Sequence, residues 1–203
     1  MKVFAKLFRR KKAVDQDAIV IVSGLPRSGT SMMMKMLEVG GLQPLTDNIR
    51  KPDDDNPKGY YEFEQVKQLE KDKSWLPDTK GKAVKIISSL LDHLPSEYFY
   101  KVIFMQRSMD EILASQKEML IRRGESGGKV TDEELAEKFH IHLQKTEDWL
   151  ARQPNFDVIY VKYNEVLQNR RDYCIKINEF LGNRLDVEKM VSAVDDTLYR
   201  QRR

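Results

Sequence analysis

The sequence has very little cysteine: Cys174 is the one cysteine among 203 residues. A single thiol excludes an internal disulfide framework and is typical of a reducing compartment. Long apolar runs are also missing, and without a stretch of about 20 apolar residues the sequence predicts no membrane-spanning helix. The N-terminus lacks the apolar core and small-residue cleavage site of a secretory signal peptide. These absences together predict a cytoplasmic protein.

The charge is spread unevenly along the chain. The formal net charge is +3, and residues 1–12 contribute +6, so the rest carries −3. A slightly acidic body without a basic, aromatic-rich stripe gives no sign of a nucleic-acid partner. Residues 1–16 are predicted to be a basic tail or a short amphipathic helix. We favour a solvated tail, and the alternative is weak peripheral contact of residues 1–12 with the inner membrane surface.

An incomplete phosphate-binding motif follows the apolar run at residues 18–22. The segment Gly24-Leu25-Pro26-Arg27-Ser28-Gly29-Thr30-Ser31 has the frame of a P-loop, but Thr30 stands where that motif has lysine. Backbone N–H groups of such a loop, together with the following helix N-terminus, bind an anion. The lysine would reach the β- and γ-phosphates of a nucleotide. We therefore expect a phosphate site that does not serve a triphosphate.

Apolar strands alternate with helical patterns through residues 17–203. Strands are expected at 18–22, 83–87, 101–105 and 157–163, with helices at 30–39, 64–73, 109–123 and 131–153, and three more near 165–168, 171–181 and 187–194. This alternation predicts an α/β fold with a central, mostly parallel sheet flanked by helices. The interpretation is one P-loop NTPase-like, three-layer domain, whose ligand lies at the carboxyl ends of the strands.

No expected strand ends in an aspartate. A magnesium-dependent NTPase needs one there, because that carboxylate helps to hold the metal bridging the phosphates. Arg107 follows one strand and Lys85 lies within another. Basic side chains in these places predict that anionic charge is neutralised by the protein, with no metal site.

Three segments together carry a resemblance to the sulfotransferases that use 3′-phosphoadenosine 5′-phosphosulfate (PAPS). Pro26–Ser31 matches their phosphosulfate loop, P-[K/R]-S-G-T-[ST], and Arg107 with Ser115 eight residues later matches their 3′-phosphate site. Residues 161–165 and 177–182 are similar to a third region, whose tyrosine corresponds to Tyr163. The resemblance implies PAPS as the sulfuryl donor. It also implies that the donor is bound by Arg27, Ser28, Gly29, Thr30, Ser31, Arg107, Ser115 and Tyr163.

The family's catalytic histidine has no clear counterpart. His93-Leu94-Pro95 lies 14 residues before Arg107, too close for the family's spacing, so His93 is interpreted as structural. Sulfuryl transfer to a hydroxyl needs a base, and some sulfotransferases use glutamate. Glu62 is the first candidate, with the equal alternative of a helix N-terminal acid, and Glu64 is the second. Lys85 is expected either to stabilise the leaving oxygen or to be a solvated edge lysine.

The leading hypothesis is a metal-independent sulfotransferase that uses PAPS. Its acceptor is a hydroxyl or amine of a small or glycan-like molecule, and Arg27, Lys85 and Glu62 carry the chemistry. One alternative is a P-loop nucleotide or nucleoside kinase-like phosphotransferase. Another is a nucleotide-binding P-loop module without turnover. Residues 42–61 and 124–129 are expected to determine the acceptor, whose identity stays open together with the oligomeric state.

Overall fold

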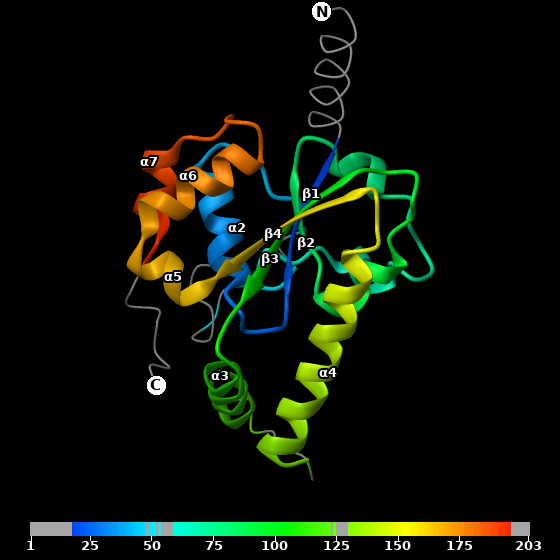
Figure 1. Ribbon diagram of the computed structural model, residues 1–203, viewed down its shortest axis with the longest axis vertical. Coiled ribbons are helices and arrows are strands. Elements are labelled where there is room, and N and C mark those ends of the chain that lie inside the picture. Colours follow the sequence, from blue (N-terminus) through cyan, green and yellow to red (C-terminus); the bar gives the residue numbers. More distant parts are fainter. Residues whose placement is uncertain are drawn as a thin grey trace, which may run out of the picture.

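A four-stranded, all-parallel sheet lies at the centre of the molecule (Figure 1). The computed structural model describes residues 18–47, 49–51, 53, 59–122, 124 and 130–195. The strands are β1 (Ile19–Gly24), β2 (Ala83–Lys85), β3 (Tyr100–Gln106) and β4 (Phe156–Lys162), in the order β2-β1-β3-β4. The α/β fold class is confirmed. The expectations for residues 1–16, and for most of 124–129, lie outside the described residues.

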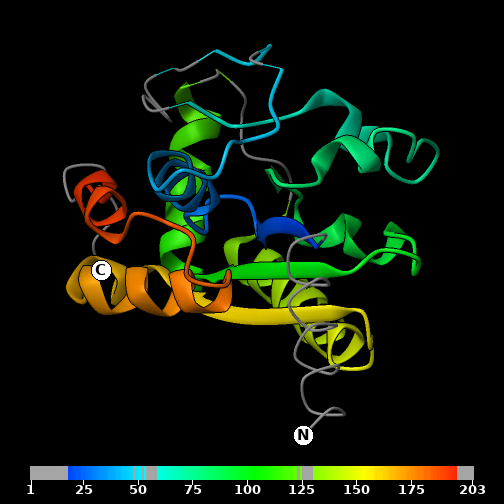
Figure 2. The same ribbon diagram turned by 90° about the horizontal axis from the view of Figure 1, so that it is seen from above.

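Helices cover both faces of the sheet (Figures 1 and 2). The α-helices are α2 (Thr30–Val39), α3 (Met109–Arg122), α4 (Asp132–Leu150), α5 (Tyr163–Gln168), α6 (Arg170–Phe180) and α7 (Val187–Ala193). Three short 3₁₀ helices are η1 (Glu64–Gln68), η2 (Leu76–Thr79) and η3 (Ser88–His93). α2, α5, α6 and α7 pack on one face, and the 3₁₀ segments and α4 pack on the other. No helix in the described part of the chain is long and apolar enough to cross a membrane.

The central strand β1 explains the two layers of core. Val20 and Val22 belong to the cluster under α2, whereas Ile19 and Ile21 belong to the cluster under the 3₁₀ segments. All four are fully buried. Side chains alternate between the faces of a strand, so a strand apolar at every position is buried on both sides, as parallel sheets require.

The strand register places the candidate residues at one edge. Val22 pairs with Lys85, and Gly24 pairs with Met105, one residue before the end of β3. The chain goes from β1 to β2 on one side of β1 and then crosses to β3 on the other side. The strand order therefore reverses between β1 and β3. Ligands of open α/β sheets bind at such a point, outside the carboxyl ends of the strands.

Most predicted elements are present, with shifted ends. Helix α2 has the predicted bounds, and Thr131 and Glu134 form a capping box at the start of α4. The helix expected at 64–73 is shorter and is the 3₁₀ turn η1. Tyr163, expected to end a strand, instead begins α5. Its strand stops one residue earlier because β3 offers no partner beyond Gln106.

Candidate active site

The loop between β1 and α2 is held in a shape that few residues adopt. Gly24 and Gly29 have φ angles of 140° and 99°, and Arg27, which is not glycine, has φ of 71°. A Cβ atom on Gly29 would lie 2.4 Å from Cδ2 of Tyr163, so the loop packs directly on that ring. Ser28 is buried, and its Oγ has no hydrogen-bond partner among the described residues. The loop therefore has a buried hydroxyl left to bond.

Arg107 is held from three directions just beyond β3. Its Nε donates to Oε2 of Glu111 at 2.7 Å, and one Nη donates to the carbonyl oxygen of Arg27 at 3.0 Å. Its guanidinium carbon lies 4.4 Å from the centre of the Tyr163 ring. The Arg107 side chain is only 8% exposed. These contacts fix a cation at the carboxyl edge of the sheet.

The loop and the Arg107 segment meet directly. Nε of Arg27 donates to Oγ of Ser115 at 2.8 Å, joining residues that are 88 positions apart. Ser115 belongs to α3 and is buried. The two halves of the predicted donor site are therefore one continuous cluster.

A second cluster surrounds Glu62. Its Oε1 accepts a hydrogen bond from Arg50 at 2.7 Å and lies 3.8 Å from Nζ of Lys85. The Arg50 guanidinium stacks 3.3 Å from the centre of the Tyr60 ring, and Lys85 donates to the Tyr60 carbonyl oxygen. Burial lowers the pKa of Lys85 to about 8, with smaller opposing and reinforcing effects of Glu62 and Arg50. Glu62 therefore lies between two cations, one of them nearly buried.

The backbone before Glu62 is also constrained. Tyr61 has φ of 53°, in the left-handed region. Its hydroxyl donates to Glu38 of helix α2 at 2.7 Å, and burial, together with this bond, raises its pKa. The Glu62 carbonyl oxygen accepts from the Thr46 hydroxyl at 2.8 Å. Contacts to α2 and to the preceding loop thus fix the position of Glu62.

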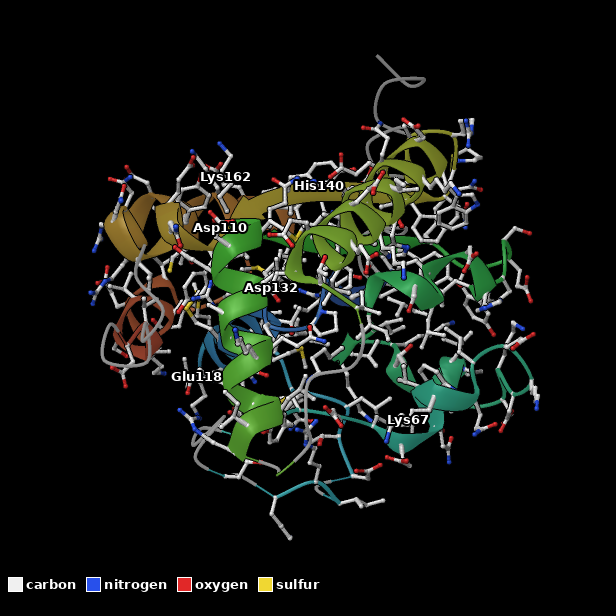
Figure 3. The ribbon with its side chains drawn as sticks, turned by 90° about the horizontal axis from the view of Figure 1, so that it is seen from below. Lys67, Asp110, Glu118, Asp132, His140 and Lys162 are labelled. Carbon is white, nitrogen blue, oxygen red and sulfur yellow. The ribbon has the colours of Figure 1, made fainter. Side chains whose placement is uncertain are left out.

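Both clusters line one cavity of about 560 Å³. Its wall includes these predicted residues: Arg27, Gly29, Thr30, Ser31, Glu62, Lys85, Arg107, Ser115 and Tyr163. Ser28 is buried and does not line it. The wall also contains Lys67 from η1 and Glu118 from α3, both labelled in Figure 3.

Several residues near the cavity were not predicted. Arg50, Tyr60 and Lys35 line it, and Glu111 and Asn164 lie behind Arg107. Glu111 had a sequence signal, since it lies on the first turn of the helix that begins just after Arg107. Arg50, Tyr60 and Asn164 had none beyond their place in segments already expected to be functional, and Lys35 had none.

Other candidates lie elsewhere. Glu64 bonds Lys67 on the surface, His93 lies 3.9 Å from Asp92, and neither Glu64 nor His93 is part of the cavity wall. Within the described ranges, no group of three or more His, Cys, Asp or Glu side chains is placed to hold a metal ion.

Fold and loop define a P-loop type of α/β protein whose loop lacks the lysine of nucleotide hydrolases. The sequence model of the sulfotransferase domain family matches residues 17–203. The chain therefore belongs to the sulfotransferase family, and it is a transferase of that family.

Solved structures support the same fold. The crystal structure of sulfotransferase STF1 from Mycobacterium tuberculosis is similar with a TM-score of 0.57 at 17% sequence identity, covering 92% of this chain and 74% of that chain. The sulfotransferase domain from the curacin biosynthetic pathway has a TM-score of 0.50 at 12% identity, covering 88% of this chain and 78% of that one. No curated protein matches the sequence.

Proposed function

We propose that this protein transfers a sulfuryl group from PAPS to a hydroxyl or amine of a small or glycan-like acceptor, without a metal ion. The observation that carries the proposal is the contact between Arg27 and Ser115. It joins a phosphate-binding loop to a second basic site within one cavity. PAPS has a 5′-phosphosulfate and a separate 3′-phosphate, so it needs two adjoining anion sites. A cytoplasmic location is part of the proposal, based on the single cysteine.

The charge of the cavity fits such a donor. Seven basic and three acidic side chains line it, a balance of +4. PAPS carries about four negative charges near neutral pH, because a phosphate monoester is close to doubly ionised there. The side chains of the cavity wall can therefore balance the negative charge of PAPS without a metal ion.

The two halves of the site have separate roles in this proposal. The loop amides of Gly29, Thr30 and Ser31 and the guanidinium of Arg27 bind the phosphosulfate, whereas the Ser28 amide already donates to the Leu25 carbonyl oxygen at 3.2 Å. Arg107 and Ser115 bind the 3′-phosphate. Tyr163 supports the nucleotide, with Arg107 stacked on its ring and Gly29 against its edge.

Glu62 is proposed as the general base. Its carboxylate lines the cavity. Arg50 and Lys85 both lie next to the Oε1 atom of this carboxylate. The acceptor hydroxyl gives its proton to this carboxylate as its oxygen bonds to sulfur. PAPS supplies the sulfuryl group. Arg27 and Lys85 stabilise the negative charge that develops on the departing phosphate oxygen.

The test is formation of a sulfated product from PAPS labelled in the sulfuryl group. The protein is incubated with EDTA and a panel of acceptors: a phenol, an alkyl alcohol, an amine and an oligosaccharide. Labelled product that survives EDTA is the expected result. A parallel reaction contains ATP and magnesium in place of PAPS and EDTA. Consumption of ATP there, with no labelled product from PAPS, would favour a kinase-like phosphotransferase. Tight nucleotide binding with no turnover of either donor would favour a binding module.

A further inference from the structure

Behind Arg107 lies a buried acid, Glu111, that the proposed chemistry does not use. It is 1% exposed, and no other Asp or Glu is buried among the residues that the structure describes. A buried carboxylate next to a phosphate site needs an explanation, because its charge opposes the ligand and its desolvation costs stability.

Both carboxylate oxygens of Glu111 accept hydrogen bonds from the protein. Oε2 accepts from Nε of Arg107 at 2.7 Å, and Oε1 accepts from Nδ2 of Asn164 at 3.0 Å. Glu111 is on the first turn of α3, Arg107 precedes that helix, and Asn164 is on α5. The carboxylate therefore links the segment after β3 to the segment after β4.

These contacts determine the orientation of the Arg107 guanidinium. A planar guanidinium held at Nε by one carboxylate and stacked on one ring has little freedom left to rotate. The ring is that of Tyr163, the residue directly before Asn164, so one short segment supplies both the stacking face and the bond to Glu111. Holding a binding group in place beforehand reduces the entropy lost when a ligand binds.

We propose that Glu111 is a positioning residue for Arg107 and determines the selectivity for a 3′-phosphate. The inference rests on the proposed function, since it takes Arg107 as the 3′-phosphate ligand. Glu111 itself is not part of the cavity wall. Its role is to hold the arginine in one orientation through Nε, with Asn164 holding Glu111 in turn.

The test compares two nucleotides that differ in the 3′-phosphate. Calorimetric titration measures the affinity for adenosine 3′,5′-bisphosphate and for adenosine 5′-monophosphate, without magnesium. Glu111→Gln keeps the shape but removes the charge, so the bond from Nε of Arg107 goes to a neutral amide oxygen in place of a carboxylate and is weaker. We expect it to weaken bisphosphate binding about tenfold or more and monophosphate binding no more than about twofold.

Asp110→Asn is the matched control. Asp110 is the neighbouring acid on the same helical turn, is exposed, and lies outside the cavity wall (Figure 3). The Asp110→Asn variant removes the same charge from the N-terminus of α3 as Glu111→Gln does. We expect it to leave the affinities for both nucleotides unchanged. If Glu111→Gln does not fold, Asn164→Ala is used in its place. We expect this variant to lose about threefold in affinity for the bisphosphate and nothing in affinity for the monophosphate.

An unchanged ratio of the two affinities in a folded Glu111→Gln or Asn164→Ala protein would overturn the inference and leave the proposed function standing. An equal loss for both nucleotides leaves that ratio unchanged and would indicate a purely structural role. A wild-type protein that binds the bisphosphate no better than the monophosphate would instead contradict the proposed function.

Discussion

Nε of Arg27 donates a hydrogen bond to Oγ of Ser115 at 2.8 Å, across 88 positions of sequence. The same arginine accepts a bond from Arg107 through its carbonyl oxygen. The loop after β1 and the segment after β3 thus form one structure, even though they are far apart in the chain.

Arg27 can be removed without straining the loop. Its φ of 71° suits glycine, so Arg27→Gly deletes the guanidinium while keeping the backbone shape. We expect sulfuryl transfer to fall by about 100-fold or more, because a donor aimed at developing charge is lost. Asn183→Gly, at φ of 57° on another segment, is the control and should retain full activity. A small loss in Arg27→Gly would remove this arginine from the chemistry.

Glu62→Gln tests the general base. Turnover should fall by about 100-fold or more, while affinity for adenosine 3′,5′-bisphosphate stays within about twofold. Glu64→Gln is the control, since Glu64 is exposed and bonded to Lys67. Steady-state kinetics and calorimetry separate the two effects. Equal turnover in the Glu62 and Glu64 variants would show that the base lies elsewhere.

Lys85 predicts a pH dependence. Burial lowers its pKa to about 8 in the free protein, so the ammonium is lost as the pH rises through that value. We expect kcat/KM for PAPS, which reports the free enzyme, to fall above about pH 8. Lys85→Arg keeps its charge and should lose this alkaline limb. A profile that is the same in both proteins would exclude the role of Lys85 in catalysis.

The same lysine affects stability with a definite sign. Its pKa is lower in the folded protein than the usual 10.5, so between about pH 8 and 10.5 the folded state binds fewer protons than the unfolded state. The contribution of Lys85 therefore makes the free energy of unfolding rise with pH across that window. Urea unfolding measures this free energy for the wild type and for Lys85→Arg, and the difference between the two isolates the effect of Lys85. A difference that falls with pH would contradict the prediction.

Gly29 and Gly41 form a matched pair for testing the loop. Both have positive φ, 99° and 105°, but a Cβ at Gly29 would lie 2.4 Å from the Tyr163 ring, whereas nothing is within 4 Å at Gly41. Both alanine variants bear the backbone strain, about 1 kcal/mol. Gly29→Ala should lose about 1–3 kcal/mol more free energy of unfolding, and nucleotide affinity as well. Equal losses in urea unfolding would mean that the ring contact is unimportant.

The fold could largely be predicted from local patterns. Signals carried by neighbouring residues include the apolar runs of β1 and β3, Gly40 and Gly41 directly after α2, and the capping box of α4. Strand alternation then leaves few topologies. The ends of elements were less predictable, as at Tyr163, because the length of β4 depends on where its partner β3 stops.

The site was predictable only where a motif spans it. Arg27, Arg107 and Ser115 stood in recognisable segments and do meet in the structure. Arg50 was not predicted, because its place beside Glu62 depends on the path of the loop from residue 42 to residue 61 rather than on any local pattern. Donor binding by Tyr163 stays a prediction, and its ring is already packed against Arg107 and Gly29.

The most direct test of the central claim is calorimetric titration of the wild-type protein with adenosine 3′,5′-bisphosphate in EDTA, beside adenosine 5′-monophosphate and ATP with magnesium. Two adjoining anion sites predict bisphosphate binding that needs no metal and exceeds monophosphate binding by about 100-fold, since a charge-assisted contact to each of two residues is gained. Tight binding of ATP that depends on magnesium, with no preference for the 3′-phosphate, would contradict the account.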